Sequence, residues 1–125
     1  MSDGWGPAAV PGHGVNRAER LLRRVALSDE RTLRPVFTEP GKPAAGDLDA
    51  RSRAFVTLGA LLSVGATAVS LRWAVEHAYA AGVTEDEVVG VLLAIAPAVG
   101  HARVVGVAPQ LALALGYDLE AEPEG

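Results

Sequence analysis

Hydrophobic and polar positions alternate with a helical period over most of the chain. Apolar residues recur every three or four positions, and this spacing places them on one face of an α-helix. Residues 1–14 lack the pattern and hold four glycines and two prolines, which predicts a flexible arm. We therefore expect an all-α fold, an antiparallel bundle of about five to six helices.

Two helices are predicted in the first third of the chain. The first covers residues 16–27, with Asn16 as its cap and an apolar stripe made by Ala18, Leu21, Leu22 and Val25. A second, short helix begins near residues 28–30 and is expected to end before Pro35. Two prolines and two glycines predict a linker over residues 38–47.

Two further helices are predicted after the linker. Asp47 or Asp49 is expected to cap a helix that ends at Gly65. The next helix covers residues 67–81 and stops at Gly82, because glycine readily adopts the left-handed conformation that ends helices.

The last two predicted helices have clear signals at their ends. The sequence Thr84-Glu85-Asp86-Glu87 forms a capping box that begins a helix over residues 85–96, which meets Pro97 and ends by Gly100. A helix over residues 102–115 contains Pro109, so we expect a kink or a break near residues 106–108. The prediction is one helical domain over residues 15–117, followed by an acidic tail over 118–125.

Composition removes several classes of function. The chain has no cysteine, so disulfides, thiolate zinc ligands and thiol nucleophiles are excluded. Its three histidines are scattered, which argues against a metal site, and no motif indicates a cofactor. A net charge of −4 argues against a general nucleic-acid surface, because phosphate contacts require clustered Lys and Arg. The start lacks a signal peptide, so a cytoplasmic protein is expected.

Charge is scarce in the second half of the chain. Residues 54–116 contain six charged side chains, and the predicted helix over 85–96 is apolar on nearly every side. A helix with this composition is normally buried all round, and a chain of 125 residues has little interior to bury it. The pattern predicts an obligate homo-oligomer. Residues 54–71 carry no charge, but their hydroxyls, glycines and expected helix break argue against a membrane-embedded segment.

The run from residue 47 to about 115 resembles the carboxymuconolactone decarboxylase and alkylhydroperoxidase-like superfamily. The resemblance rests on an opening Leu48-Asp49-Ala50-Arg51 and on a helix end of the form A-x-x-A-G-x-T-x-x-E-[IV]. In this chain that second element comprises Ala78 to Gly82, Thr84, Glu87 and Val88. The resemblance implies an all-α fold that assembles as trimers or hexamers.

The catalytic residues of that superfamily are missing at the matching positions. Its two cysteines would fall at Thr67 and Ser70, its histidine at Ala74 and its glutamate near Ala54. Thiol-based peroxide reduction is excluded, because the chain has no thiol nucleophile. The decarboxylase branch keeps a histidine at the position of Ala74, and this chain lacks it too.

One candidate site lies on the predicted helix over residues 67–81. His77 comes three positions after Ala74 and could move a proton, with Trp73 as a wall of the pocket. Arg72 and Glu76 are spaced as an i, i+4 ion pair, and the arginine could hold a substrate carboxylate. The structural alternatives are a dipole-stabilising histidine, a surface ion pair and a packing tryptophan.

His101 and Arg103 form the second candidate site. His101 follows Gly100 at a predicted helix start, which favours the neutral imidazole that can act as a base. Arg103 is the one charged residue between Glu87 and Asp118, so it is expected to pair with an anionic ligand or with a carboxylate across a subunit interface.

Two functions from different classes follow. The first is a cofactor-free lyase or isomerase that binds a small, partly apolar anion between the predicted helices over 67–81 and 102–115. His77 or His101 would move the proton, and Arg103 or Arg72 would hold a carboxylate. The second is a non-catalytic homo-trimer or homo-hexamer that acts as a ligand-binding or assembly protein. The two differ in whether His77 and His101 share a cavity with Arg103 or lie in solvent.

Overall fold

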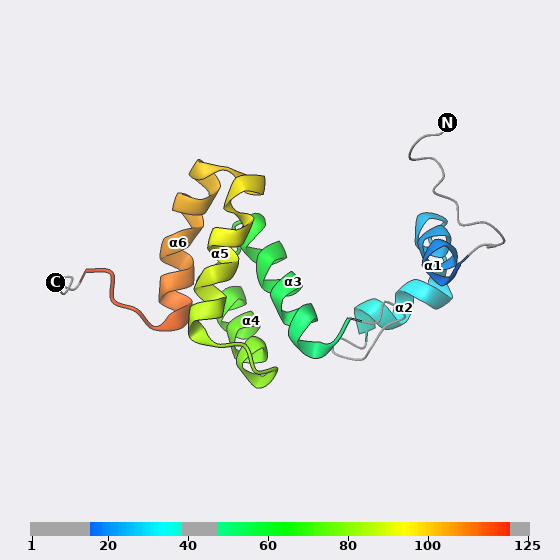
Figure 1. Ribbon diagram of the computed structural model, residues 1–125, viewed down its shortest axis with the longest axis horizontal. Coiled ribbons are helices and arrows are strands. Elements are labelled where there is room, and N and C mark those ends of the chain that lie inside the picture. The colour runs from blue at the N-terminus through cyan, green and yellow to red at the C-terminus, as the bar shows by residue number, and fades with distance from the viewer. Residues whose placement is uncertain (1–15, 39–47, 121–125) are drawn as a thin grey trace, which may run out of the picture. The chain divides into compact units, whose positions relative to one another are not determined.

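The computed structural model describes residues 16–38 and 48–120, and all the regular elements in these two ranges are α-helices (Figure 1). The chain divides into two compact units, residues 1–47 and residues 48–125. The second unit begins one residue after the start of the segment with the family resemblance. The predicted arm over 1–14, most of the linker and the end of the acidic tail lie outside the described residues.

The first unit contains two helices that pack together. Helix α1 spans Arg17–Ala26 and helix α2 spans Glu30–Thr38. Asn16 caps α1 as predicted, because its side chain accepts a hydrogen bond from the backbone N–H of Glu19 at 2.8 Å. No residue of α1 or α2 is buried.

Helix α2 does not end before Pro35, contrary to the prediction. The helix continues through the proline to Thr38, whose hydroxyl donates to the carbonyl oxygen of Arg34 at 2.9 Å. Proline removes one helical hydrogen bond by lacking an N–H. On an exposed helix the carbonyl left without that partner can bond to water, so the helix tolerates the residue.

The second unit is a bundle of four helices in which every helix packs against the other three. Helix α3 spans Ala50–Ser63 and α4 spans Ala68–Ala80; α5 spans Glu85–Val99 and α6 spans His101–Leu115. Short turns join consecutive helices, so the chain reverses direction at each connection (Figure 1). The observed helices support the predicted all-α bundle.

Local signals set the helix ends in this unit. Of the two predicted caps for α3, Asp49 accepts from the N–H of Ser52 at 2.7 Å, whereas Asp47 lies outside the described residues. The capping box of α5 is complete. Gly82 and Gly100 have φ angles of +88° and +92°, which non-glycine residues rarely adopt, and Gly100 alone connects α5 to α6.

Pro97 and Pro109, the two prolines of the second unit that the structure describes, lie inside helices. Helix α5 extends past the predicted range of 85–96 and through Pro97, and it ends at Val99, before Gly100 as predicted. Helix α6 is continuous through Pro109, so the predicted break near residues 106–108 is wrong. Packing of α6 against the other three helices holds it together across the missing hydrogen bond.

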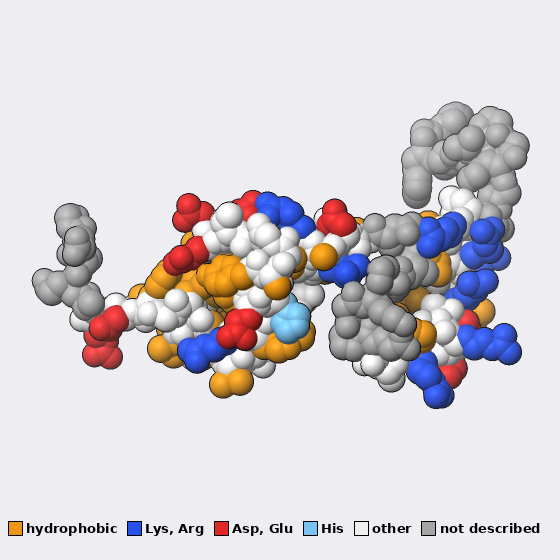
Figure 2. Space-filling view, turned by 90° about the horizontal axis from the view of Figure 1, so that it is seen from below, with side chains coloured by type: hydrophobic (Ala, Val, Ile, Leu, Met, Phe, Trp, Pro, Cys, Tyr) orange, Lys and Arg blue, Asp and Glu red, His pale blue; other side chains and the backbone are white. Residues whose placement is uncertain are grey.

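The core of the second unit is built from small and medium aliphatic side chains. Leu58, Leu62, Leu71 and Val88 are fully buried, and each contributes about 1.5–3 kcal/mol by leaving water. No polar side chain is buried among the described residues. Large apolar side chains also lie on the surface, among them Val69 at 81% exposure and Leu93 at 65%. Figure 2 shows such hydrophobic patches over this unit.

Candidate functional site

The candidate cluster on α4 lies at the surface. The rings of Trp73 and His77 are 4.3 Å apart between centroids, and Nδ1 of His77 donates to the carbonyl oxygen of Trp73 at 2.9 Å. Both side chains are exposed, whereas Ala74, the position that matches the family histidine, is 2% exposed. His77 therefore lies outside the core into which Ala74 points.

Arg72 has a different partner from the one predicted. Its Nη2 donates to the carbonyl oxygen of Leu113 at 3.1 Å, and no ion pair joins it to Glu76 in the described part of the chain. Leu113 lies in the last turn of α6, where its carbonyl oxygen also accepts from the N–H of Gly116 at 3.0 Å and the helix dipole favours a cation. Arg72 therefore joins α4 to the end of α6.

Arg103 lines a shallow groove of about 420 Å³ at the α5–α6 connection. Its guanidinium lies beside the turn after α3, with Nη1 3.7 Å from the point where a Cβ on Gly65 would stand. Within residues 16–38 and 48–120 the side chain forms no hydrogen bond and no ion pair. The rest of the groove is made by small or apolar residues: Val99, Ala102, Gly106 and Val107.

The structure does not bring the predicted site residues together. His101 is exposed at the start of α6 and does not line the groove of Arg103, and neither does His77. The groove is formed by α5, α6 and the turn after α3, not by α4 and α6. Among the described residues, no group of three or more His, Cys, Asp or Glu side chains is placed to hold a metal ion.

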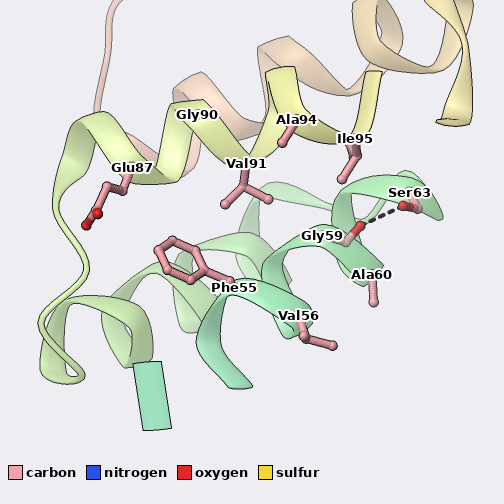
Figure 3. Close-up of a pocket in the computed structure, with 10 residues that line it drawn as sticks. All are labelled: Phe55, Val56, Gly59, Ala60, Ser63, Glu87, Gly90, Val91, Ala94 and Ile95. Atoms are coloured by element: carbon pink, nitrogen blue, oxygen red, sulfur yellow. Dashed lines mark hydrogen bonds between the residues drawn. The ribbon is translucent and has the colours of Figure 1, made fainter. Parts of the chain in front are cut away.

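A second and larger groove runs between α3 and α5, with a volume of about 510 Å³ (Figure 3). Phe55 and Val56 stand on the α3 side, and Val91 and Ile95 stand on the α5 side. The remaining lining residues are small, apart from the polar Ser63 and Glu87: Gly59, Ala60, Gly90 and Ala94. The hydroxyl of Ser63 donates to the carbonyl oxygen of Gly59 at 2.6 Å, so it offers no free donor.

The end of this groove at Glu87 is fixed by Arg51. One guanidinium nitrogen of Arg51 pairs with the carboxylate of Glu87, and the other donates to the carbonyl oxygen of Gly82 at 2.8 Å. The guanidinium also lies over the Phe55 ring, 5.1 Å from its centroid. Arg51 and Glu87 both belong to the motifs of the family resemblance. The sequence did not predict that they pair, because no local spacing relates positions so far apart.

Hydrogen bonds set the protonation state of Glu87. The N–H of Thr84 donates to its carboxylate at 2.9 Å and the Arg51 guanidinium adds a second charged donor, so the pKa of Glu87 lies below the ordinary glutamate value. Nearby, the hydroxyl of Tyr117 donates to Glu85, which raises the pKa of Tyr117 to about 12. The carboxylate of Glu87 therefore joins the start of α5 to α3, and the carboxylate of Glu85 joins it to the segment after α6.

Comparison with protein-family profiles, with curated proteins and with solved structures found no match to this chain. No helix in the described ranges combines the length and the apolar character that crossing a bilayer requires.

Proposed function

We propose that this chain is a carboxymuconolactone decarboxylase-like protein that binds a small, partly apolar anion without converting it. The observation that carries the proposal is the position of Arg103, whose guanidinium has no protein partner among the described residues and stands in a groove whose other lining residues are small or aliphatic. The exposure of His77 and His101, both outside that groove, favours binding over catalysis.

The chemistry of the groove defines the class of ligand. A guanidinium offers two parallel N–H donors to a carboxylate or sulfonate, and these charge-assisted hydrogen bonds are the strong ones in proteins. Val99 and Ala102 would contact the apolar part of the ligand, while Gly65 and Gly106 leave room close to the backbone. Such a site selects an anion that carries a hydrocarbon or aromatic body.

The proposal includes a cytoplasmic homo-oligomer, a trimer or a hexamer. Leu93, Val105 and Leu113 are each more than half exposed in the single chain, as are Val56 and Val69. So many exposed large apolar side chains are typical of surfaces that another subunit covers.

Fluorescence titration with 1-anilinonaphthalene-8-sulfonate, an apolar anion, tests the binding site. We expect Arg103→Ala to weaken its binding at least tenfold, because the charge-assisted hydrogen bonds are lost. N-phenyl-1-naphthylamine lacks the sulfonate and should bind the variant and the original chain equally. Arg72→Ala is the matched control, since Arg72 is an exposed arginine outside the groove. Equal sulfonate binding by Arg103→Ala and the original chain would exclude the proposed site.

One observation favours a second candidate function, proton transfer by His77. Because Nδ1 donates to the carbonyl oxygen of Trp73, Nε2 is the unprotonated nitrogen of the neutral ring, and this exposed side chain could use it as a base. Native mass spectrometry would identify a small molecule that co-purifies with the chain. Incubating that molecule in D₂O should then give deuterium at a carbon next to its carbonyl group, and His77→Ala should abolish this exchange. Exchange at the original rate in the variant would remove His77 from any catalytic role.

A further inference from the structure

The groove between α3 and α5 is suited to a helix rather than to a small molecule. Its two polar lining residues are both engaged, Ser63 with the carbonyl oxygen of Gly59 and Glu87 with Arg51 and Thr84. Small-molecule sites orient their ligands with a few converging polar groups, and this groove offers none that is free. Its glycines and alanines instead allow the close approach of an apolar helix face (Figure 3).

Helix α1 exposes an apolar stripe of matching character. The stripe contains Ala18, Leu21, Leu22 and Val25 on one side of the helix, with the arginines on the other side. Leu22 is 70% exposed and Val25 is 47% exposed, although α1 packs against α2. No other helix in the described part of the chain separates its apolar and polar side chains so completely. Such a stripe normally lies against another surface.

We infer that α1 of a second copy of this chain occupies the groove between α3 and α5. The lengths agree, since the stripe from Ala18 to Val25 covers roughly 11 Å and the groove wall from Phe55 to Ser63 covers roughly 12 Å, at 1.5 Å per residue.

The charges of the two surfaces are also complementary. Helix α1 carries four arginines and one glutamate: Arg17, Arg20, Arg23, Arg24 and Glu19 (Figure 2). The first turn of α5, at one end of the groove, carries Glu85, Asp86 and Glu87. The net positive charge of α1 therefore favours its approach to the acidic end of the groove.

Each copy contributes two different surfaces to this contact, α1 and the groove between α3 and α5. Each copy donates its α1 and accepts another α1, so the contact is head-to-tail and closes into a ring or a reciprocal dimer. This inference adds to the proposed homo-oligomer the surfaces that join its copies, and it does not involve Arg103.

Disulfide trapping tests the contact directly, because the chain has no cysteine of its own. One full-length variant carries Ala18→Cys in the stripe, and a second, isotopically labelled variant carries Ala60→Cys in the groove wall. After mixing and mild oxidation, we expect a disulfide between one labelled and one unlabelled chain. A chain with both substitutions that forms the bond only within itself would overturn the inference. The absence of any disulfide between the two introduced cysteines would overturn it as well.

Filling the groove provides a second test that does not disturb the fold. A Cβ added at Gly90 meets nothing within 4 Å, so Gly90→Phe should fold while its ring blocks the groove. Gly106→Phe is the control, because Gly106 is equally open but lies on α6 outside this groove. By analytical ultracentrifugation we expect Gly90→Phe to reduce the oligomer to 12.9 kDa monomers and Gly106→Phe to preserve it. If the Gly90→Phe variant keeps the mass of the oligomer, α1 docking in this groove is excluded as the contact that joins the copies. The proposed homo-oligomer itself would not be contradicted.

Discussion

Arg51 and Glu87 are 36 positions apart in the chain and form an ion pair that joins the first turn of α3 to the first turn of α5. Glu87 also closes the capping box of α5, and Arg51 also bonds to Gly82 in the turn before it. A single pair therefore holds three parts of the bundle: the start of α3, the α4–α5 turn and the start of α5.

Replacing Arg51 by Ala should destabilise the chain more than a typical surface substitution. The variant loses the pair with Glu87, the bond to the Gly82 carbonyl and the contact with the Phe55 ring. Arg34→Ala is the matched control, since Arg34 forms an exposed i, i+4 pair with Glu30 at 3.0 Å, which contributes about 0.3–0.5 kcal/mol. Urea unfolding should show a clearly larger loss for Arg51→Ala. Equal losses would mean that the three contacts of Arg51 do not stabilise the fold.

Acid should weaken the bundle through Glu87 and Asp49. The pKa of each carboxyl is lowered in the folded chain, chiefly by the backbone N–H of Thr84 for Glu87 and by that of Ser52 for Asp49. A lowered folded pKa stabilises the folded state at pH values above the ordinary carboxyl pKa, near 4, and this stabilisation is lost as the pH falls through the folded pKa. Unfolding free energies measured by urea at pH 6, 4 and 3 should decrease in that order.

The variant Glu87→Gln tests whether Glu87 contributes to that decrease. The amide does not titrate in this range, so the variant should be less stable at pH 6 and should lose less stability on acidification than the original chain does. An unchanged pH dependence in Glu87→Gln would assign the effect to other carboxyls.

Two glycine substitutions should change stability in opposite directions. Gly106 lies inside α6 with open space around a new Cβ, so Gly106→Ala should stabilise the chain by roughly 0.5–1 kcal/mol. Gly82 has a φ angle of +88°, so Gly82→Ala should destabilise it by roughly 1–2 kcal/mol. Thermal unfolding followed by circular dichroism measures both effects. A loss of stability in Gly106→Ala would contradict the open environment described for that position.

Leu62 should be among the most sensitive positions of the core. Its side chain is fully buried, and Leu62→Ala should cost roughly 2–5 kcal/mol through lost burial and the cavity that remains. Val69→Ala removes an aliphatic side chain that is 81% exposed and should change stability by less than about 0.5 kcal/mol. Chemical unfolding at low protein concentration separates this effect from assembly. Similar costs at the two positions would contradict the assignment of the core.

Local sequence signals predicted the helices well, because their causes are local. Asn16, Asp49 and Thr84 each accept a hydrogen bond from a backbone N–H three residues later, and this geometry can be read from spacing alone. The prolines were misjudged for the opposite reason. Pro35 and Pro109 remain inside helices because exposure to water in one case and packing in the other offsets a lost hydrogen bond.

The candidate site was harder to predict, because its contacts join distant positions. The pair of Arg51 with Glu87 and the bond of Arg72 to the Leu113 carbonyl bring together residues from different helices, and no periodicity encodes them. Helical spacing correctly placed His77 near Trp73, yet it did not indicate that the imidazole lies in solvent. The position of the His77 ring depends on how α4 is rotated toward the core.

The start of helix α4 is bonded to Gln110, a residue that the ribosome adds to the chain much later. The N–H of Ala68, in the first turn of α4, donates to the side-chain carbonyl of Gln110 on α6 at 2.9 Å. At roughly 5–20 residues per second, the 42 positions that separate Gln110 from Ala68 take several seconds to synthesise. During that interval the start of α4 must remain hydrated or be held by another molecule. The nascent bundle is thus completed only when its last helix has emerged from the exit tunnel.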